Sequence, residues 1–381
     1  MIHETSISTD LPAEARRRLT SEPVMVVDLA AIRRNFQALA RMAQGSCAAI
    51  VKGDAYGHGM VESARTLLAA GAELFFTARF EDALVLRNTL GQGPRIAALD
   101  GVTEDGMKEA VAQDIIPVVN SREQLQTASD AAIRQGAPLA AFVHLDTAMN
   151  RLGLAPDDDD LALPLLKNLD VQAYMTHFAS ADDVDLDLCR LQAERLRDRA
   201  SRFPEAPLSI ANSCGVFLGQ EFHGHIIRPG KSTFGINPLA DAANPLHEPA
   251  TVLAPVVQIR TLCKGDPVGY SCTWHAPETR RVAILAIGYA NGYLRGNSNL
   301  GHVAFGDRIA PVVGRVSMDL TAVDISALPE STVHVGSMAE IVGKTINYRS
   351  LANTVGTNEH EAIIALGRGC YRTYVGGDAV A

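Results

Sequence analysis

The stretch AAIVKGDAYGHGM, residues 48–60, begins as a buried strand and ends as a glycine-rich loop. Its first four residues are all apolar, which is typical of a parallel strand covered on both faces. Lys52 follows directly, and Tyr56, His58 and three glycines come within the next seven residues. A lysine at a strand end is usually only solvated. Whether Lys52 has a chemical role therefore depends on what the other strands end on.

Seven further apolar runs follow the first one. The eight runs cover residues 48–52, 74–78, 95–99, 115–119, 140–145, 171–176, 207–211 and 225–228. The stretches between them have helical spacing: Leu125, Ala128 and Ala132, for example, fall at i, i+3 and i+7. Eight βα units in succession favour a (β/α)8 TIM-like barrel over an open, doubly wound sheet. No GxGxxG follows the first strand, which counts against a dinucleotide-binding fold.

The character of the sequence changes after about residue 245. Short β-rich segments such as 251–262, 302–313 and 331–343 follow one another, and Gly-Asp turns at 265–266 and 306–307 separate some of them. We therefore expect a barrel at 24–244, a mostly β C-terminal domain at 245–381 and an N-terminal extension at 1–23. The strand expected at 24–29 could belong to either domain.

The composition points to a globular protein of the cytoplasm. The net charge of −9 gives no reason to expect nucleic acid or an anionic membrane as partner. The six cysteines are irregularly spaced without a CxxC, which indicates reduced thiols. The N-terminus has no apolar core of a signal peptide, and no apolar run is long enough to span a bilayer. The acidic run 157–160 after Pro156 predicts a solvated helix start.

The carboxyl ends of barrel strands face one common site. The predicted strands end on basic and small polar residues: Lys52, Asp146 with Arg151, His177, Asn212-Ser213 and Arg228-Pro229-Gly230. Each of these residues alone has an ordinary structural explanation, such as a solvated lysine, a helix cap or a hydrogen-bonded histidine. Their convergence on one face is what favours a catalytic site.

Such a set suits Schiff-base chemistry. A partly desolvated lysine amine can lose its proton and attack a carbonyl. Ser213, Tyr56 and the N–H groups around Gly230 could hold a phosphate, and together these groups suit pyridoxal 5'-phosphate. A cofactor-free aldolase acting on a sugar phosphate is an alternative, but it leaves Arg228 and His177 without a task. We expect no metal.

The chain resembles the alanine racemases, pyridoxal-phosphate enzymes of the barrel fold type, along nearly its whole length. The similar motifs occur in order: VKGDAYGHG (51–59), HLDTAMNRLG (144–153), THFASAD (176–182), ANS (211–213), RPGKSTFG (228–235), VGYSCTW (268–274), AIGYANGY (286–293) and GRVSMDLTAVD (314–324). One such match would be weak, whereas several in order at family-like separations are highly specific.

The resemblance implies a homodimer with shared active sites. Lys52 would carry the cofactor and act as one base, and Tyr270 of the partner subunit would act as the other. The cofactor contacts that it implies are Tyr56, His177, Asn212, Ser213, Arg228, Gly230 and Lys231. The substrate contacts are Arg151, Met318, Asp319 and Tyr289. Racemisation needs acid/base groups on two opposite faces, and a tyrosine needs cationic or hydrogen-bonding neighbours to ionise near neutral pH. His177, linked onward to Arg228, would provide them.

Several positions differ from the family pattern. His144 replaces a lysine that is often carbamylated, so we hypothesise that a bound anion or a carboxylate such as Asp146 orients Arg151 here. Ala148 and Asn150 stand where glycines are common, and asparagine tolerates positive φ better than most residues. Phe234 replaces a frequent tyrosine. Lys231, where an aliphatic residue is usual, is equally consistent with a phosphate contact and with a solvated lysine.

The resemblance implies interconversion of L- and D-alanine for peptidoglycan precursors. A racemase of broader specificity, or one for serine, is an alternative because one hydroxyl is weakly discriminated. A barrel-type amino-acid decarboxylase fits less well, since Tyr270 is present and a Cys-Asp specificity pair is lacking. A non-catalytic pyridoxal-phosphate carrier would lack the second domain. The amino-acid preference, the strength of the dimer and a biosynthetic or catabolic role do not follow from the sequence.

Overall fold

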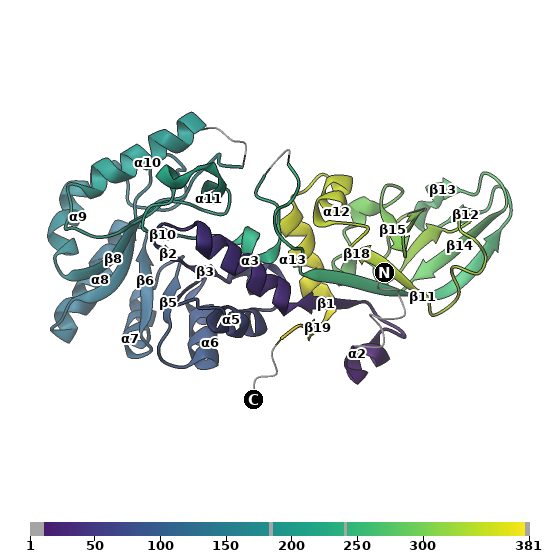
Figure 1. Cartoon of the computed structure of the whole chain (residues 1–381), viewed down its shortest axis with the longest axis horizontal. Helices are drawn as coiled ribbons and strands as arrows, with labels where there is room; N and C mark the ends of the chain where they lie inside the picture. The colour runs from purple at the N-terminus through teal and green to yellow at the C-terminus, as the bar shows by residue number, and fades with distance from the viewer. Residues whose placement is uncertain (1–10, 183–185, 240–241, 378–381) are drawn as a thin grey trace. The chain divides into compact units, whose positions relative to one another are not determined.

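The computed structural model describes residues 11–182, 186–239 and 242–377 (Figure 1). The chain forms two compact units. The barrel unit contains residues 32–55 and 60–247. The β unit contains the described residues up to Ala31, the short segment 56–59, and the chain from residue 248 onward.

The barrel unit is built on parallel strands, as the apolar runs predict. Seven of them form one sheet in sequence order: β3 (Ala49–Ile50), β4 (Leu74–Thr77), β5 (Arg95–Ala98), β6 (Ile115–Val119), β7 (Leu139–His144), β8 (Leu169–Met175) and β9 (Leu208–Ser209). The ring is continued by β10 (Ile226–Ile227), which pairs in parallel with β2 (Ser46–Cys47) just before β3. On its other side, His225 N donates to Leu208 O over 2.7 Å. The predicted barrel-type architecture is thus confirmed.

Helices follow the strands in the expected alternation (Figure 1). They are α3 (Leu29–Met42), α5 (Met60–Ala69), α6 (Phe80–Leu90), α7 (Glu104–Ala112), α8 (Arg122–Gln135), α9 (Asp159–Leu166), α10 (Leu186–Ala200) and α11 (Gly215–Leu218). In α8 the Ser121 hydroxyl accepts from Gln124 N at the start, and Gly136 ends the helix at φ 70°. The apolar positions Leu125, Ala128 and Ala132 are buried, as their spacing predicts.

The acidic run 157–160 is not wholly solvated, and at Asp159 that prediction is wrong. The run forms a 3-10 turn, η1 (Pro156–Asp158), and the start of α9. Asp159 is only 2% exposed, and its buried carboxylate accepts a hydrogen bond from Nε of Arg199 over 3.1 Å. A buried carboxylate requires such a partner.

The β unit contains an eight-stranded sheet. Its strands are β1 (Val24–Asp28), β11 (Ala250–Leu262), β14 (Arg280–Leu285), β15 (His302–Phe305), β16 (Arg308–Pro311), β17 (Thr321–Asp324), β18 (Met338–Val342) and β19 (Tyr371–Val375). Strand β1 lies between β11, to which it is antiparallel, and β19, to which it is parallel. The strand expected at 24–29 therefore pairs with the mostly β part of the chain.

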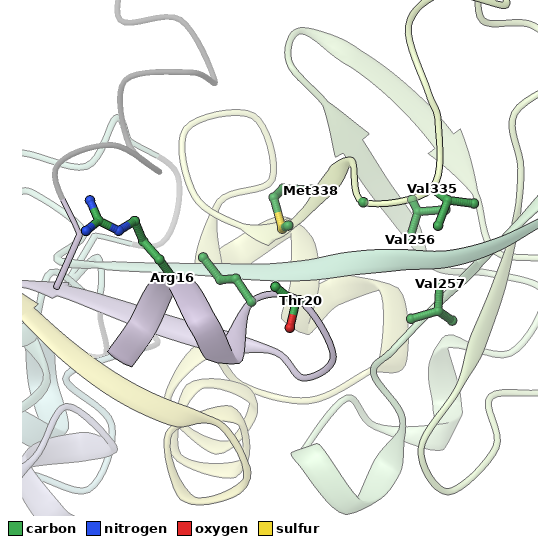
Figure 2. A pocket seen from close by; sticks show the side chains of 8 residues that line it. Arg16, Thr20, Val256, Val257, Val335 and Met338 are labelled. Carbon is green, nitrogen blue, oxygen red and sulfur yellow. The ribbon is translucent and has the colours of Figure 1, made fainter. Parts of the chain in front are cut away.

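Smaller elements complete the β unit. They are α2 (Ala13–Arg18), α4 (Lys52–Tyr56), whose last residue lies in this unit, the hairpin β12 (Pro267–Val268) and β13 (Trp274–His275), η4 (Tyr270–Cys272), α12 (Tyr348–Val355) and α13 (Glu359–Gly369). An apolar groove of about 510 Å3 lies between the end of α2 and β11. It is lined by Val256, Val257, Val335 and Met338, by Arg16 of α2 and by Thr20 just after this helix (Figure 2). Its lining includes none of the predicted site residues.

Candidate active site

Lys52 directly follows the end of β3, at the carboxyl end of the barrel strands. Its side chain is half-buried. Burial lowers the pKa of its amine, and the positive charges of Arg151 and Arg228 lower it further, while the carboxylate of Asp100 opposes them. Since only the unprotonated amine is a nucleophile, this environment favours the reactive form of Lys52.

The chain turns sharply after Lys52, with four successive residues in the left-handed region. The φ angles of Gly53, Asp54, Ala55 and Tyr56 are 64°, 56°, 54° and 53°. Only the first is a glycine, and each of the other three costs roughly 1 kcal/mol in this conformation. The carboxylate of Asp54 offsets part of this cost by accepting a hydrogen bond from Met60 N over 2.7 Å.

Arg151 lies on the loop that follows β7, and the loop is organised by Asp146. One oxygen of this carboxylate accepts from the backbone N–H groups of Ala148, Met149 and Asn150, at 3.1, 3.0 and 3.1 Å. Ala148 and Asn150 have φ of 145° and 53°, values that glycine adopts at least cost. Asp146 therefore orders the backbone that carries Arg151.

Helix α10 holds this loop from one side. Arg199 is buried, and its Nη1 donates to the carbonyls of both Asp146 and Leu154, at 2.8 and 3.0 Å. Arg195, one turn earlier, donates to the carbonyl of Thr147 over 3.1 Å. Both ends of the Arg151 loop are thereby bound to one rigid helix.

The same helix also holds the segment that carries His177. Gln192 donates to the carbonyl of His177 over 3.0 Å and accepts from Ala179 N over 2.9 Å. Gln192, Arg195 and Arg199 lie at i, i+3 and i+7, on one face of α10. We did not predict these three residues; their spacing in LQAERLRDRA was the available signal.

Arg228 and His177 follow β10 and β8. The buried guanidinium of Arg228 donates to the Ser209 hydroxyl and to the carbonyl of Thr176. Burial lowers its pKa to about 10. Burial, followed by the charges of Arg228 and Lys52, lowers the pKa of His177 to about 3. His177 is therefore neutral near pH 7, and the fixed positive charges suit an anionic ligand.

The loops after β9 and β10 bring two serines together. The Ser213 hydroxyl accepts from Ser232 N over 3.2 Å, and Asn212 caps the following turn by accepting from Gly215 N over 3.0 Å. Within the described parts of the chain, the buried Ser232 hydroxyl has no hydrogen-bond partner. Lys231, beside it, forms an ion pair of 2.6 Å with Asp182. Phe234 is fully buried.

Tyr56 is half-buried, whereas the predicted site residues from position 248 onward are all exposed. Tyr270, in the turn between β12 and β13, is 70% exposed, so it is not a core aromatic. The next two residues have φ of 60° and 47°, and Arg315 donates to the Ser271 hydroxyl over 3.0 Å. Tyr289 N donates to Ser317 O over 3.0 Å. This bond brings Tyr289 close to Met318 and Asp319 in the same unit.

His58 has a structural partner. It is fully buried, and its Nε2 lies 3.1 Å from the Tyr348 hydroxyl, which also accepts from Ala250 N over 2.8 Å. Because the hydroxyl accepts from the backbone, its own proton is available to His58. The histidine of the opening motif thus connects the glycine-rich segment to α12.

A half-buried lysine near two arginines, at the carboxyl end of a parallel barrel, is the arrangement expected of an enzyme that works through a lysine amine. Among the described residues no group of three or more side chains could hold a metal ion. In that same part of the chain no helix is long and apolar enough to cross a membrane.

Comparison with known proteins gives the family. The models of the alanine racemase N-terminal and C-terminal domains match residues 27–238 and 250–374. A catabolic alanine racemase of Agrobacterium fabrum is 38% identical over 355 residues, covering 92% of each chain. The structure is similar to alanine racemase of Bartonella henselae with covalently bound pyridoxal phosphate (TM-score 0.89, 30% identity, covering 93% of this chain and 100% of that one). It is also similar to the biosynthetic alanine racemase of Pseudomonas aeruginosa (TM-score 0.85, 31% identity, 93% and 99% covered). The chain belongs to the alanine racemase family, whose members are isomerases.

Proposed function

We propose that this chain interconverts L-alanine and D-alanine with pyridoxal 5'-phosphate, using Lys52 and Tyr270 of the partner subunit as the two bases. The proposal is supported above all by the lowered pKa of the Lys52 amine at the carboxyl end of the barrel strands. Burial and the charges of Arg151 and Arg228 lower it. The relatives described above are named alanine racemases, and the structure of one of them contains covalently bound pyridoxal phosphate.

The residues at the barrel's carboxyl end fit the cofactor. The Ser232 hydroxyl is buried without a partner among the described residues and lies next to Ser213, as expected where a phosphate supplies the missing acceptor. Ser213, Asn212, Tyr56 and the backbone at Gly230 would hold the phosphate, with Lys231 balancing its charge beside Asp182. When bound, the cofactor supplies the electron sink that stabilises negative charge at the substrate's α-carbon.

The chain's own residues would divide the remaining work. Lys52 would take or return the α-proton on one face of the substrate, and Tyr270 of the partner subunit would do so on the other. Arg151 would bind the carboxylate of the substrate. Arg228 can only donate hydrogen bonds, so a pyridine nitrogen held by it would stay unprotonated, which would favour return of the proton to the α-carbon. His177 would connect Arg228 toward the tyrosine, and Tyr289, Met318 and Asp319 would shape the entrance.

The dimer and the cellular role belong to the same proposal. The exposure of Tyr270, Tyr289 and Met318 supports a surface that completes the site of a second subunit. All six cysteines are free, which supports a reducing compartment such as the cytoplasm. There the reaction would supply D-alanine for peptidoglycan.

Two measurements test the reaction. Exchange of the α-proton in D2O, run with a panel of L- and D-amino acids, should be fastest with alanine. Borohydride should attach the cofactor to Lys52, and Lys52→Ala should abolish exchange. Attachment to a different lysine would refute the site, and a preference for serine would refute the substrate.

Subunit complementation tests the shared site. Lys52→Ala and Tyr270→Phe should each be strongly impaired as homodimers, and Tyr270→Phe should affect one enantiomer more than the other. In mixed dimers one of the two sites would regain both groups, so an equal mixture should recover about a quarter of the wild-type activity. No recovery in demonstrably mixed dimers would place both bases on one chain.

A further inference from the structure

The turn that carries Tyr270 has a backbone conformation that does not suit its sequence. The carbonyl of Gly269 accepts from Cys272 N over 3.3 Å, so Tyr270 and Ser271 are the central residues of this turn. Ser271 has φ of 60° and ψ of 14°. A positive φ at the second central position is normally supplied by glycine or asparagine, because most side chains raise its cost. The hydroxyl group is what Ser271 offers here and glycine lacks.

The hydroxyl of Ser271 connects the turn to the segment 314–319. It accepts a hydrogen bond from Nη1 of Arg315 over 3.0 Å. The two backbones also approach each other at this point, since a Cβ added to Gly269 would lie 3.4 Å from Arg315 N. The half-buried Arg315 therefore belongs to a segment that packs directly against the turn.

A second bond connects the end of the turn to the same segment. The Thr273 hydroxyl accepts from Nδ2 of Asn299 over 3.1 Å, and Oδ1 of Asn299 accepts from Gly314 N over 2.6 Å. Because a backbone N–H only donates, the amide oxygen must face Gly314 and the NH2 group must face Thr273. Asn299 therefore bridges Thr273 to the residue just before Arg315.

The segment 314–319 also carries other site residues predicted in this unit. Met318 lies three residues after Arg315, and the Ser317 carbonyl accepts from Tyr289 N over 3.0 Å. The two hydroxyl bonds of the turn therefore set the position of Tyr270 relative to Met318 and Tyr289.

We infer that these two hydroxyl bonds orient Tyr270 for proton transfer, and that Arg315 and Asn299 are therefore positioning residues. This inference rests on the proposed function for the role of Tyr270 as a base. The Tyr270 side chain is 70% exposed, so its orientation depends on the backbone of the turn more than on packing around the ring. Proton transfer requires a precise approach of the base to the α-carbon, and a small misplacement is costly.

Exchange of the α-proton in D2O tests this role in the holoenzyme. Tyr270→Phe should change the ratio of the exchange rates of L- and D-alanine, because the two bases work on opposite faces. Ser271→Gly should move this ratio in the same direction, by about five- to tenfold. The ratio does not depend on how much enzyme is folded or loaded with cofactor. A purely structural role of the bond would therefore leave it unchanged.

Further variants separate positioning from support of the fold. Ser271→Gly should not lower the unfolding temperature, because glycine relieves the positive φ. Ser271→Ala keeps the positive φ and also lacks the hydroxyl, so it should be less stable than Ser271→Gly but shift the ratio equally. Thr273→Val removes the second bond and should act in the same direction. Thr345→Val is the matched control: its hydroxyl donates to the Gly306 carbonyl over 3.0 Å in the same unit, and the ratio should stay as in the wild type.

Fluorine nuclear magnetic resonance tests the orientation itself. In the holoenzyme labelled with fluorotyrosine, the signal missing from Tyr270→Phe belongs to Tyr270. This signal should shift or broaden in Ser271→Gly and Thr273→Val, and stay unchanged in Thr345→Val. An unchanged signal or an unchanged exchange ratio in the first two variants would overturn the inference.

The outcomes distinguish this inference from the proposed function. If the wild type exchanged no α-proton, or if Tyr270→Phe left the ratio unchanged, the proposed role of Tyr270 would fail. The fluorine signal alone would then decide whether the two bonds orient Tyr270.

Discussion

Arg199 and Asp159 form a buried ion pair at the base of the Arg151 loop. Nε of Arg199 donates to the carboxylate over 3.1 Å, and both side chains are almost entirely shielded from solvent. Nη2 of Arg199 donates to the same carboxylate over 2.5 Å, and the other bonds of the guanidinium go to the backbone carbonyls of Asp146, Leu154 and Ala155. A single guanidinium thus joins α9, α10 and the loop that carries the proposed carboxylate ligand.

Removing Arg199 should therefore cost much of the stability. Arg199→Met leaves Asp159 buried without its main partner, and breaking a buried pair in this way typically costs about 3–5 kcal/mol. Arg202→Met is the matched control: Arg202 contacts the same carboxylate over 3.0 Å, but its side chain is 54% exposed, so it should lose less than about 1 kcal/mol. Denaturant unfolding of both variants checks this, and equal losses would contradict it.

The orphan hydroxyl of Ser232 should matter only for the cofactor. Ser232→Ala should leave the apoprotein at least as stable, because no hydrogen bond to a described residue is lost. It should weaken pyridoxal phosphate binding by about tenfold. Ser63, another buried serine whose hydroxyl has no partner in the described chain, provides the control: Ser63→Ala should leave the affinity unchanged. Cofactor titration and thermal unfolding distinguish the two serines.

The stability of the β unit should fall as the pH rises from about 4.5 to about 7. Burial, assisted by the negative charge of Glu359, raises the pKa of Glu248 from 4.5 to about 7. In that window the unfolded chain has lost this proton and the folded chain still binds it, so stability decreases with pH and stays lower above pH 7.

Glu248→Gln should remove this dependence. The variant should gain about 2 kcal/mol over the wild type at pH 8 and nothing at pH 4. The exposed Glu330→Gln serves as the control and should change neither value. Urea unfolding at the two pH values gives the answer; a gain that is the same at both would count against the titration of Glu248.

The left-handed turn after Lys52 predicts opposite tolerance at two nearby positions. Ala55→Gly should change stability by less than about 1 kcal/mol, since relief of the φ of 54° offsets the loss of a buried methyl group. Gly57→Ala should be clearly more destabilising, because φ is 85° and an added Cβ would lie 2.8 Å from the Ile363 carbonyl oxygen. Thermal unfolding of the two variants checks which one is more destabilised. A greater loss of stability in Ala55→Gly than in Gly57→Ala would contradict the prediction.

The barrel strands and the strand-end residues could be predicted because buried parallel strands are almost entirely apolar. The polar residue after each strand is therefore the one that the sequence singles out as a site candidate. Lys52, Arg151, His177 and Arg228 were predicted in this way, and in the structure the charges of Arg151 and Arg228 act on both Lys52 and His177.

The supporting residues could not be predicted by the same reasoning. Gln192 and Arg199 are polar residues on a helix, and without the fold they resemble any solvent-facing pair. The ion pair of Lys231 with Asp182 joins residues 49 positions apart, which no local pattern indicates. The left-handed turn at Asp54 and Ala55 was hidden because neither residue requires that conformation.

The position of β1 between β11 and β19 has a consequence for synthesis on the ribosome. Val24 pairs with Leu253 on one side and with Tyr371 on the other. Strand β1 is made early, but it can pair with β19 only after almost the whole chain has been synthesised. Every strand of the barrel can pair with its neighbours before that point. Parallel pairing over such a distance is slow and leaves an open strand edge exposed meanwhile. A nascent chain that stops before residue 371 would thus contain a complete barrel and an unprotected β edge, and we expect it to be the form most readily captured by chaperones.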